Sequence, residues 1–595
     1  MKAPFRKIKT AIVPIGSGKS GGTALAMAKV LAEEVVLVGV VAINKGESVS
    51  AGAQAARQVR KRLLELREGP TVRFKSTVIV SETPWRDLQE IIVHEKPDLL
   101  VVEWENGKLA SGIPLLEVLS NSLVNVVVVR GPVPLKYEKT LVAVRGGPHA
   151  ELALQVGLNL HPAQLDVLHI SMTGAENDAP FKGFKSILTQ IPEINPRSIV
   201  TDDVSKTLFE EANHYDLVIL GTSASSAIGG PSIGPVAERL LRDSPATVMV
   251  TKIRREVTQE VFDETAGSQA ISILVDKWFA ENTFHVDEFA DLKRLMELKE
   301  AQNLTISLAM PALNEEETVG KVITTIKKAL MEDVPLLDEM ILIDSDSTDR
   351  TREIAEDLGV KTYIHQHILP ELGARTGKGE ALWKSLLITH GDIVAWIDTD
   401  IVNIQPHFVY GIIGPLLLNP AIQFVKGFYR RPLKVGTKMQ AGSGGRVTEL
   451  TARPLLNLFY PELSGVIQPL AGEYAGRRGA LEKATFFSGY GVETGLLIDV
   501  FERFGLNAIA QVDLLERIHH NQELEALGKM SFAIIQTVLH KLETRYERSI
   551  IENVNKTMKL IRYENGEYFL DVEEIAEQER PPMISLPVYQ ADHKK

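Results

Sequence analysis

The sequence contains no cysteine among its 595 residues. This absence excludes disulfide bonds, thiolate catalysis and zinc sites built from cysteine. A chain without disulfides suits a reducing compartment, so we expect a cytoplasmic protein. Any reactive or metal-binding group must therefore be sought among the other side chains.

Long apolar runs are also absent. The longest purely apolar stretch, residues 35–43, is far shorter than the ~20 residues that a membrane helix needs. The basic N-terminal residues MKAPFRKIKT are not followed by an apolar core, so they do not predict a signal peptide. We therefore expect no membrane-bound segment.

Positive charge is in deficit, because 65 lysines and arginines stand against 77 aspartates and glutamates, for a net charge of -12. This balance argues against nucleic acid as a partner, since that role needs a basic face. An anionic substrate must be met by a local cluster of lysine and arginine. With 44% hydrophobic and 24% charged residues, the chain is globular, and its length predicts about three or four domains.

Residues 1–252 contain an internal repeat. Each half opens with a short apolar strand and a glycine-containing turn, at residues 9–18 and 139–147. Further apolar strands follow in each half, at residues 97–102 and 125–129 in the first and at residues 215–220 and 246–250 in the second. Continuous apolar strands that alternate with helices predict parallel sheets covered on both faces.

The second half resembles the universal stress protein family, whose nucleotide loop has two glycines three apart and, nine residues later, Gly-Ser or Gly-Thr. Here Gly221 to Ala224 is followed by nine residues and Gly234-Pro235, so the spacing is kept. Ala224 replaces a glycine, and Pro235 removes a hydroxyl and a backbone donor that a phosphate site would use. In the first half, residues 103–107 have lost the motif and carry acids where phosphates would sit.

This resemblance implies two universal stress protein-like domains, residues 1–135 (degenerate) and 136–252. Two readings stay open for them. We favour a dimerisation or regulatory module in both halves, and the alternative is ATP or another adenine nucleotide bound at the second half. We also expect a homodimer.

A charged, helix-like segment at residues 253–302 predicts a helical connector. A third region, residues 303–560, again alternates strands and helices. Its strands are expected at residues 305–310, 340–344, 361–365, 392–398 and 423–428. Residues 561–595 are mixed in character, and we expect them to form an extended or disordered tail.

In the third region, Asp398 and Asp400 follow the apolar run IVAWI at residues 393–397. Two acids one residue apart point to the same side of an extended segment, because strand side chains alternate. At the mouth of a buried strand they offer hard oxygen ligands, and Mg²⁺ is commonly held by one or two carboxylates and substrate phosphates. The alternative reading is a solvated turn.

Three other polar loops accompany this pair: PALNEE at residues 311–316, DSDSTD at 344–349 and GKGE at 377–380. In an open α/β sheet, ligands bind at the carboxyl ends of the strands. The four loops would therefore line one crevice, where Lys378 can meet a diphosphate as a point charge.

These loops resemble the nucleotide-sugar half of GT-A glycosyltransferases and, among them, the glucosyl-3-phosphoglycerate synthase family. The resemblance covers residues 303–540 and also includes GKGEALW at 377–383, FYRRPL at 428–433, GGRVTEL at 444–450, QPLAGEY at 468–474 and GYGVE at 489–493. It implies an α/β chain in which a GT-A (Rossmann-like) domain follows the two parallel α/β domains in the sequence. It also implies a metal-dependent, retaining transfer of glucose from an NDP-glucose, with UDP-glucose favoured, to the 2-hydroxyl of 3-phosphoglycerate.

The resemblance further implies roles for single residues on the donor side. These are Pro311, Leu313, Glu315 and Ser345 at the nucleobase and ribose, Lys378 and Arg517 at the diphosphate, Asp398 and Thr399 at the ribose and sugar, and Leu470 and Tyr490 as further donor-binding residues. Asp400 would bind Mg²⁺ or Mn²⁺ together with His519, for which His520 is a rival. Glu493 would be catalytic beside Asp400, by placing the donor sugar or the acceptor hydroxyl.

On the acceptor side, the resemblance implies that Gly445, Arg446 and Thr448 bind the phosphate and carboxylate, with Asn521 as a weaker candidate. The chemistry fits, since glycines before a helix leave backbone donors free and a helix N-terminus favours an anion. Arg446 can also pair bidentately with an oxyanion.

The sequence leaves two alternative functions open. The same fold could use GDP-mannose and give mannosyl-3-phosphoglycerate. Alternatively, the chain could act mainly as a nucleotide-sensing regulatory protein through its tandem domains. The intact catalytic motifs favour an enzyme.

Overall fold

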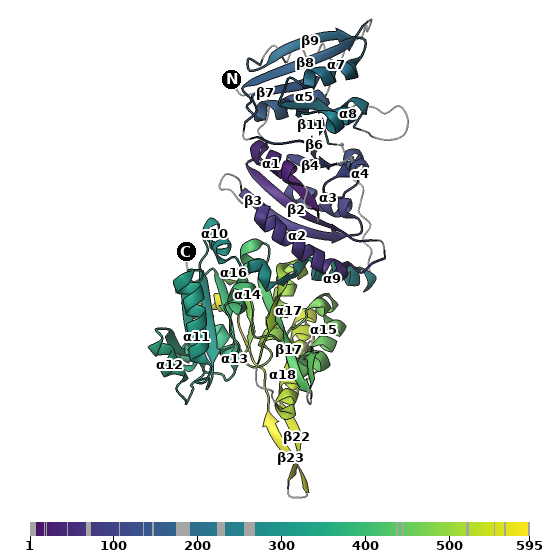
Figure 1. The fold of residues 1–595 in the computed structure, drawn as a ribbon. Coiled ribbons are helices and arrows are strands. Elements are labelled where there is room, and N and C mark those ends of the chain that lie inside the picture. Colours follow the sequence, from purple (N-terminus) through teal and green to yellow (C-terminus); the bar gives the residue numbers. More distant parts are fainter. Residues whose placement is uncertain are drawn as a thin grey trace. The chain divides into compact units, whose positions relative to one another are not determined.

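The computed structural model describes residues 8–16, 18, 21–44, 46–66, 73–105, 108–134, 136–144, 148–173, 188, 191–222, 233–254, 268–435, 438–442, 445–518, 523–551, 554–564 and 567–592. The chain forms two compact units, Met1–Thr265 and Ala266–Lys595 (Figure 1). Within the described ranges, no helix is both long and apolar enough to cross a membrane.

The first unit is built on one sheet whose strand order repeats. The order is β3-β2-β1-β4-β6-β11-β10-β7-β8-β9, with the short β5 beside β4. Apart from β5, which is antiparallel to β4, neighbouring strands within each half are parallel. The halves meet at β6 and β11, which run antiparallel to each other. The repeat in the sequence is therefore visible as two copies of one strand order, joined in a single sheet.

The strands of this unit are β1 Thr10–Gly16, β2 Glu34–Ala42, β3 Arg73–Ser81, β4 Leu99–Glu105, β5 Lys108–Leu109, β6 Asn125–Arg130, β7 Lys139–Val144, β8 Gln164–Met172, β9 Asn195–Thr201, β10 Leu217–Gly221 and β11 Thr247–Lys252. The helices are α1 Gly22–Leu31, α2 Ala53–Leu66, α3 Pro84–Glu95, α4 Leu115–Asn121, α5 Pro148–Asn159, α7 Val204–Ala212 and α8 Pro235–Asp243. The central strands are buried along nearly their whole length, which is why they read as continuous apolar runs.

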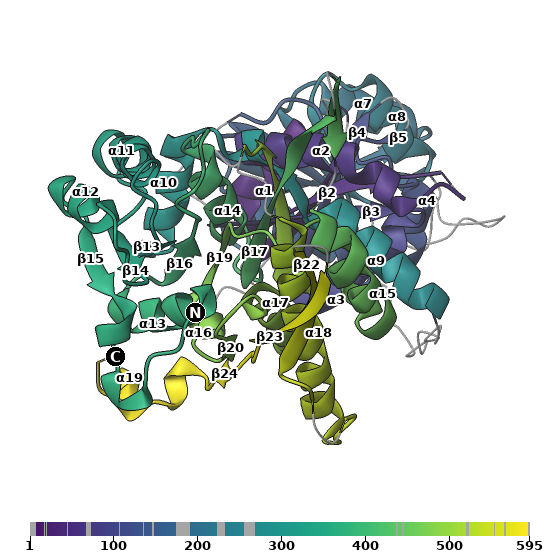
Figure 2. The same cartoon turned by 90° about the horizontal axis from the view of Figure 1, so that it is seen from below.

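The second unit contains a mixed sheet in the order β12-β21-β17-β19-β16-β13-β14-β15, with β18 beside β17. The four strands β16, β13, β14 and β15 are parallel, and β19 is antiparallel to both β16 and β17. Figure 2 shows the strands side by side from β15 to β17, with α11 and α13 on opposite faces. This arrangement brings the carboxyl ends of β13, β14 and β16 to one edge.

The strands of this unit are β12 Thr283–His285, β13 Ile306–Ala312, β14 Glu339–Asp344, β15 Lys361–Ile364, β16 Ile393–Trp396, β17 Phe424–Val435, β18 Lys438–Gly442, β19 Tyr474–Arg477, β20 Phe486–Phe487, β21 Ile509–Glu516, β22 Thr557–Glu564, β23 Glu567–Glu574 and β24 Glu579–Arg580. The helices are α9 Ser268–Asn282, α10 Leu292–Ala301, α11 Val319–Lys327, α12 Thr351–Asp357, α13 Lys378–Ile388, α14 His407–Leu418, α15 Arg453–Phe459, α16 Arg478–Leu481, α17 Val492–Phe504, α18 Leu524–Tyr546 and α19 Pro587–Asp592. All five strands expected in the third region are present, as β13 to β17.

Apolar packing fixes the carboxyl ends of the central strands. All four residues of β16 are buried, and burial of each Ile or Val contributes about 2 kcal/mol relative to exposure. The indole N–H of Trp396 donates to Ser385 Oγ at 2.9 Å, which ties β16 to α13. The loops that follow these strands therefore start from rigid positions.

The segment predicted as a connector is part of the second unit. Its strand β12 pairs in parallel with β21, so residues 283–285 extend the main sheet. Trp278 of α9 is buried, and its indole N–H donates to the Ile509 carbonyl at 2.8 Å. The segment therefore contributes to the core of this unit.

The prediction of an extended or disordered C-terminal tail is wrong for the described residues. Strands β22 and β23 form a hairpin, and β24 pairs with β20. Residues 575–592, which we call the C-terminal strap, also place Met583 and Tyr589 in the core. Composition does not predict this ordered structure, because the strap is short and charged and packs against residues that are distant in the sequence.

Candidate active site

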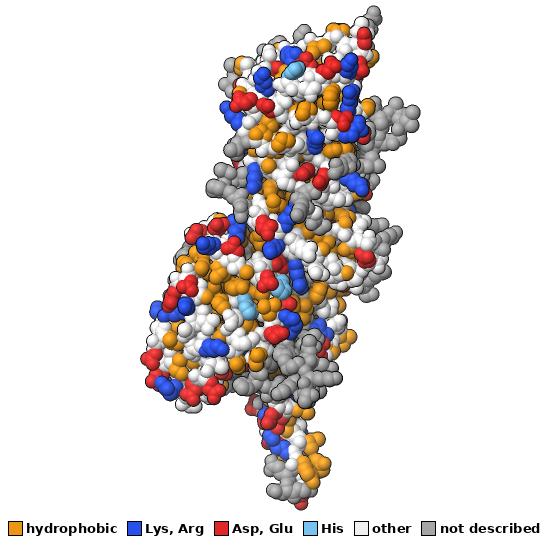
Figure 3. All heavy atoms as spheres, viewed as in Figure 1, with side chains coloured by type: hydrophobic (Ala, Val, Ile, Leu, Met, Phe, Trp, Pro, Cys, Tyr) orange, Lys and Arg blue, Asp and Glu red, His pale blue; other side chains and the backbone are white. Residues whose placement is uncertain are grey.

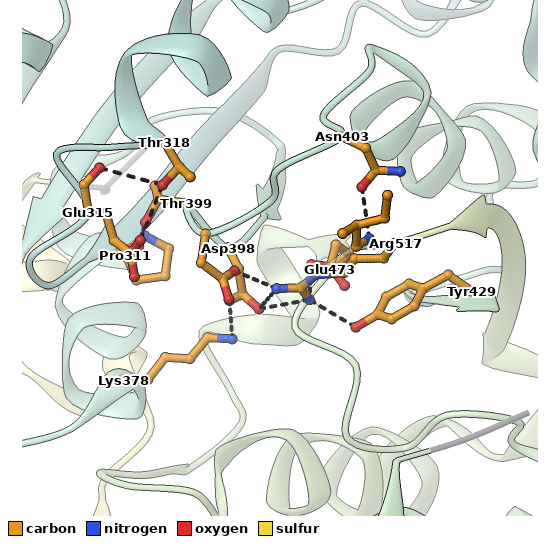
Figure 4. A network of polar contacts seen from close by, with 12 residues as sticks. Pro311, Glu315, Thr318, Lys378, Asp398, Thr399, Asn403, Tyr429, Glu473 and Arg517 are labelled. Atoms are coloured by element: carbon orange, nitrogen blue, oxygen red, sulfur yellow. Dashed lines mark hydrogen bonds and ion pairs between the residues drawn. The ribbon is translucent and has the colours of Figure 1, made fainter. Parts of the chain in front are cut away.

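Arg517, directly after β21, is the centre of a buried polar network (Figure 4). Its Nη2 donates to Asp400 Oδ1 at 2.5 Å and to Asp398 Oδ2 at 3.1 Å. Its Nη1 donates to Glu473 Oε1 at 2.7 Å and to the Tyr429 hydroxyl at 2.9 Å. One guanidinium therefore gathers three carboxylates from two separate segments of the chain, the loop after β16 and the residue before β19.

Lys378 extends this network on its other side. Lys378 is the first residue of α13, and its Nζ donates to Asp398 Oδ1 at 2.6 Å. The same Nζ lies 3.1 Å from Glu493 Oε1, on the second residue of α17. Four charged residues expected at the site are thus linked in one row, from Glu493 through Lys378 and Asp398 to Arg517, and Asp400 lies at its end.

Opposite charges keep Asp398 and Lys378 of this row ionised. Burial disfavours the charged form of Asp398, but the positive charges of Lys378 and Arg517 outweigh it and hold the pKa of Asp398 well below its usual range. Burial likewise opposes the charge of Lys378, but Asp398 and Glu493 raise its pKa well above the usual value. The site therefore presents fixed charges that need no rearrangement of protons at neutral pH.

The sequence pattern predicted that strand alternation places Asp398 and Asp400 on one side. The structure shows a different cause. Strand β16 ends at Trp396, so Asp398 and Asp400 lie in the loop beyond it. Gly472 makes room for this loop, since a Cβ there would lie 2.2 Å from Asp398 Oδ2. The two acids converge because both face Arg517.

Hydrogen bonds connect the carboxyl end of β13 to the loops after β16 and β14. Thr399 is buried and its Oγ1 donates to the Pro311 carbonyl at 3.0 Å. The N–H of Ser345 donates to the Ala312 carbonyl at 2.9 Å, so the two loops lie side by side. Leu313 is 53% exposed, so it is available to a ligand at this edge.

Glu315 lies in the same loop, and Thr318 Oγ1 donates to its Oε2 at 3.2 Å. Burial raises the pKa of the Glu315 carboxyl, and the negative charge of Asp400 adds to the rise. The structure thus brings Glu315 within the electrostatic influence of the acidic pair.

The residues that the sequence predicts to bind the acceptor lie at the start of a helical segment. Gly445 and Arg446 precede Thr448, which is buried at the start of a π-helical turn (residues 448–452) leading into α15. Leu470 packs against a small apolar cluster that includes Val447. The 468–474 segment and the helical residues 446–452 are therefore in contact through this cluster.

The structure places Tyr490 but does not describe two other predicted site residues, His519 and Asn521. Tyr490 is 48% exposed, in the turn that precedes α17. His519 and Asn521 lie outside the described residues, and so does His520. Their assignments stay predictions.

Sequence reasoning assigned no role to three buried residues of the site. Glu473 is fully buried, and its Oε2 has no hydrogen-bond partner among the described residues. The Tyr429 hydroxyl is buried and accepts a hydrogen bond from Arg517 Nη1 at 2.9 Å. Burial lowers the pKa of Lys426 to about 7, while its Nζ donates to the Ala471 carbonyl at 2.5 Å. The signal was available, since all three lie in or next to the motifs at 428–433 and 468–474.

The described residues fit a metal ion held mainly by its substrate. No group of three or more metal-ligating side chains occurs among them. Both oxygens of Asp398 are engaged by Lys378 and Arg517, whereas the Asp400 side chain is 39% exposed and only its Oδ1 faces Arg517. A single accessible carboxylate matches Mg²⁺ or Mn²⁺ sites that are completed by phosphate oxygens.

Comparisons with known proteins point to the same region. The family model for Glycosyl transferase family 2 matches residues 307–478. Glucosyl-3-phosphoglycerate synthase of Petrotoga mobilis is 51% identical over 315 residues, which is 53% of this chain and 97% of that protein.

Two solved structures are also similar. Mannosyl-3-phosphoglycerate synthase from Rubrobacter xylanophilus is 37% identical, over 52% of this chain and 97% of its own, with a TM-score of 0.48. Glucosyl-3-phosphoglycerate synthase from Mycobacterium tuberculosis, in complex with Mn²⁺, uridine-diphosphate and glucosyl-3-phosphoglycerate, is 43% identical, over 49% of this chain and 94% of its own, with a TM-score of 0.43.

Proposed function

Because this chain belongs to the glucosyl-3-phosphoglycerate synthase family, we propose that it transfers glucose from UDP-glucose to the 2-hydroxyl of 3-phosphoglycerate. The products are glucosyl-3-phosphoglycerate and UDP. The second unit carries this activity on a GT-A fold, within which the glycosyltransferase model matches.

The observation that carries the proposal is the row of fixed charges at the carboxyl edge of the sheet. Lys378, with a pKa held high by Asp398 and Glu493, is a permanent cation for the donor diphosphate. The loops after β13 and β14 supply the nucleoside side, through Pro311, Glu315 and Ser345. A charged, preorganised site of this kind stabilises charge that develops on the leaving diphosphate.

We place the divalent metal at Asp400, with His519 as its second protein ligand. When bound, Mg²⁺ or Mn²⁺ acts as a Lewis acid on the diphosphate. Arg517 donates to both Asp400 and Asp398, which holds them in place, and its positive charge offsets the repulsion between the two carboxylates. The protein therefore provides a formed carboxylate site.

The acceptor is held at the helical N-terminus of residues 445–448. The backbone N–H groups and Arg446 bind the phosphate and carboxylate of 3-phosphoglycerate. The bond between the anomeric carbon and the diphosphate oxygen breaks with its electron pair going to UDP. The acceptor oxygen forms the new bond on the same face, and its hydroxyl proton passes to the departing diphosphate oxygen. Glu493, held by Lys378, places the reacting groups.

A donor-by-acceptor assay tests this function. We expect UDP release from UDP-glucose to depend on 3-phosphoglycerate and on Mg²⁺ or Mn²⁺. Equal release with and without the acceptor would refute the acceptor assignment. A clear preference for GDP-mannose would instead make the chain a mannosyl transferase.

For the first unit, we propose two universal stress protein-like halves, residues 1–135 and 136–252, that serve in assembly or regulation. In the first half, Glu103 Oε2 accepts the N–H groups of Thr23 and Ala24 at 2.8 and 3.1 Å, at the start of α1. This carboxylate fills the place where a helix N-terminus would bind a phosphate. The observation supports a first half without nucleotide.

The second half is the remaining candidate for ATP or another adenine nucleotide. Its helix α8 starts at Pro235, after Gly234, and Ser223 and Ala224 lie outside the described residues. Titration with ATP, followed by intrinsic fluorescence or calorimetry, tests this site. A regulatory role would require that ATP changes the transferase rate.

We further propose that the chain acts as a cytoplasmic homodimer. Its support is the β22–β23 hairpin, which projects from the second unit and carries a patch of apolar side chains (Figures 1 and 3). The patch consists of exposed residues on one face of the hairpin, Ile561, Tyr563, Tyr568, Leu570 and Val572. An isolated two-stranded hairpin is marginal in water, so a second copy of the chain is the partner we assign to it.

A further inference from the structure

The C-terminal strap contacts the active-site domain beside α13. Its strand β24 pairs antiparallel with β20. Arg580 donates to both carboxylate oxygens of Glu380, at 2.7 and 2.8 Å, and both side chains are buried. The indole N–H of Trp383 donates to the Pro581 carbonyl at 2.9 Å. The strap therefore runs along α13 and β20, as Figure 2 shows.

Within the strap, Glu577 lies against the turn from Gly489 to Gly491. The N–H of Gly489 donates to Glu577 Oε2 at 3.1 Å. Burial raises the pKa of the Glu577 carboxyl, and the N–H groups of Gly489, Gly491 and Tyr490 act against that rise. A Cβ on Gly489 would lie 2.4 Å from Glu577 Oε1. The turn is therefore shaped around this carboxylate.

Helix α18 fixes Glu577 in turn. Gln536 Nε2 donates to the Ile575 carbonyl at 2.9 Å, and Gln536 Oε1 accepts the N–H of Glu577 at 3.2 Å. The neighbouring Thr537 packs on the turn, since a Cβ on Gly491 would lie 1.9 Å from Thr537 Oγ1. Strap and helix thus hold the turn from two sides.

The same turn leads directly into the proposed chemistry. Helix α17 begins at Val492, and Glu493, its second residue, pairs with Lys378 at 3.1 Å. On the other side, the N–H of Glu380 donates to the Ser488 carbonyl at 3.2 Å. A short segment, residues 487–491, therefore connects the strap both to Glu493 and to the helix that carries Lys378.

We propose that Glu577 is a positioning residue for Glu493. Its carboxylate fixes the Gly489–Gly491 turn, and the strap thereby holds Glu493 and Lys378 in register with each other. This inference rests on the proposed function, in which Glu493 places the reacting groups. An amide in place of the carboxylate offers the N–H groups of the turn only one oxygen, no charge, and an NH2 group where the second oxygen stood, so the start of α17 is free to shift. A displacement of about 1 Å at a reacting centre can lower the rate about 100-fold.

The test compares the full-length variants Glu577→Gln, Glu577→Asp and Glu574→Gln. Glu574 is the matched control, because it is an exposed acid three positions earlier on β23. For Glu577→Gln we expect kcat to fall about 10- to 100-fold while KM for UDP-glucose and 3-phosphoglycerate changes less than about twofold. Glu577→Asp should recover part of the loss, and Glu574→Gln should match the wild type.

Amide hydrogen exchange of residues 486–495 gives a second readout that needs no turnover. We expect faster exchange in Glu577→Gln than in the wild type and in Glu574→Gln. An active Glu577→Gln with wild-type kcat, or unchanged exchange in this segment, would overturn the proposal. If the wild type itself makes no product from either donor, the proposed function fails, and the exchange comparison alone then decides the positioning role.

Discussion

At the scale of single residues, Arg517 explains how three carboxylates share one buried place. Asp398, Asp400 and Glu473 would repel one another strongly in a dry interior, because charges interact more strongly at low dielectric. Arg517 donates to all three, and its own pKa is held well above the usual value by Glu473 after burial is overcome. The arginine therefore allows these carboxylates to lie together at the edge where we propose the metal.

The first prediction concerns the metal. Replacing Asp400 by Ala removes the accessible carboxylate, and we expect kcat to fall about 100-fold or more and to lose its dependence on Mg²⁺ or Mn²⁺. Steady-state assays across a metal titration measure both effects. Asp357→Ala, a change to an exposed acid at the end of α12, is the control. A variant that kept the wild-type metal response would remove Asp400 from the site.

The second prediction concerns the acceptor. Replacing Arg446 by Ala removes a charged partner of the phosphate or carboxylate, so KM for 3-phosphoglycerate should rise about tenfold or more. KM for UDP-glucose should stay within about twofold, because the donor is held by other residues. Arg350→Ala, at an exposed arginine, serves as the control. If only the KM for UDP-glucose rose, Arg446 would belong to the donor site and the acceptor assignment would be refuted.

At the scale of secondary-structure elements, local pattern predicted the strands and loops of the site well. The loops at 311–316, 344–349 and 377–380 could be located because each adjoins an apolar strand or a helix start. The convergence of Asp398 and Asp400 was expected for the wrong reason, since β16 ends before them. What places them is Arg517, more than 100 positions away, with Gly472.

The C-terminal strap shows what local pattern cannot supply. Arg580 and Glu380 are 200 positions apart, and each alone reads as an ordinary surface charge. Only the fold brings them together, where burial and bidentate pairing make them mutually dependent. The same holds for Glu473 and Tyr429, which take their roles from a distant arginine.

The third prediction concerns the pH dependence of the strap. His540 lies 3.2 Å from Glu579, and this hydrogen bond raises the pKa of His540 above 6.5. Burial opposes the charge of Glu579, but His540 and Lys541 lower its pKa to about 2. The pair therefore stabilises the fold fully between about pH 4.5 and 6.5. Its contribution is lost as the pH rises through the pKa of His540, or falls toward that of Glu579.

Thermal unfolding measures this effect. Relative to the wild type, His540→Asn should be less stable at pH 5.5, and the difference should shrink at pH 8.5. The half-exposed pair contributes less than about 1 kcal/mol, so we expect a shift of a few degrees at most. His214→Asn, at an exposed histidine of the first unit, should show no such pH-dependent difference. A constant difference at both pH values would exclude the ion pair as its source.

At the scale of the whole molecule, every described residue of the site lies in the second unit. A chain that lacks residues 1–252 should therefore keep kcat and both KM values within about twofold of the full chain. Because the truncated chain keeps the β22–β23 hairpin, it should stay a dimer, and a regulatory first unit requires that the two chains differ in response to ATP. A monomeric truncated chain would place the dimer contact in the first unit. Loss of transferase activity on deletion, with an intact fold by circular dichroism, would show that the first unit contributes to catalysis.

The hairpin gives the last prediction, on assembly. Its exposed apolar side chains lie on both strands. Burying them against a second copy of the chain would stabilise the dimer through the hydrophobic effect. Changing Ile561, Tyr568 and Leu570 together to Ser should convert the dimer to a monomer in size-exclusion chromatography with light scattering. The matched control changes Ile273, Leu274 and Val200, exposed apolar residues elsewhere, to Ser. A triple hairpin variant that stayed dimeric would move the interface away from the hairpin, and a monomeric wild type would refute the dimer itself.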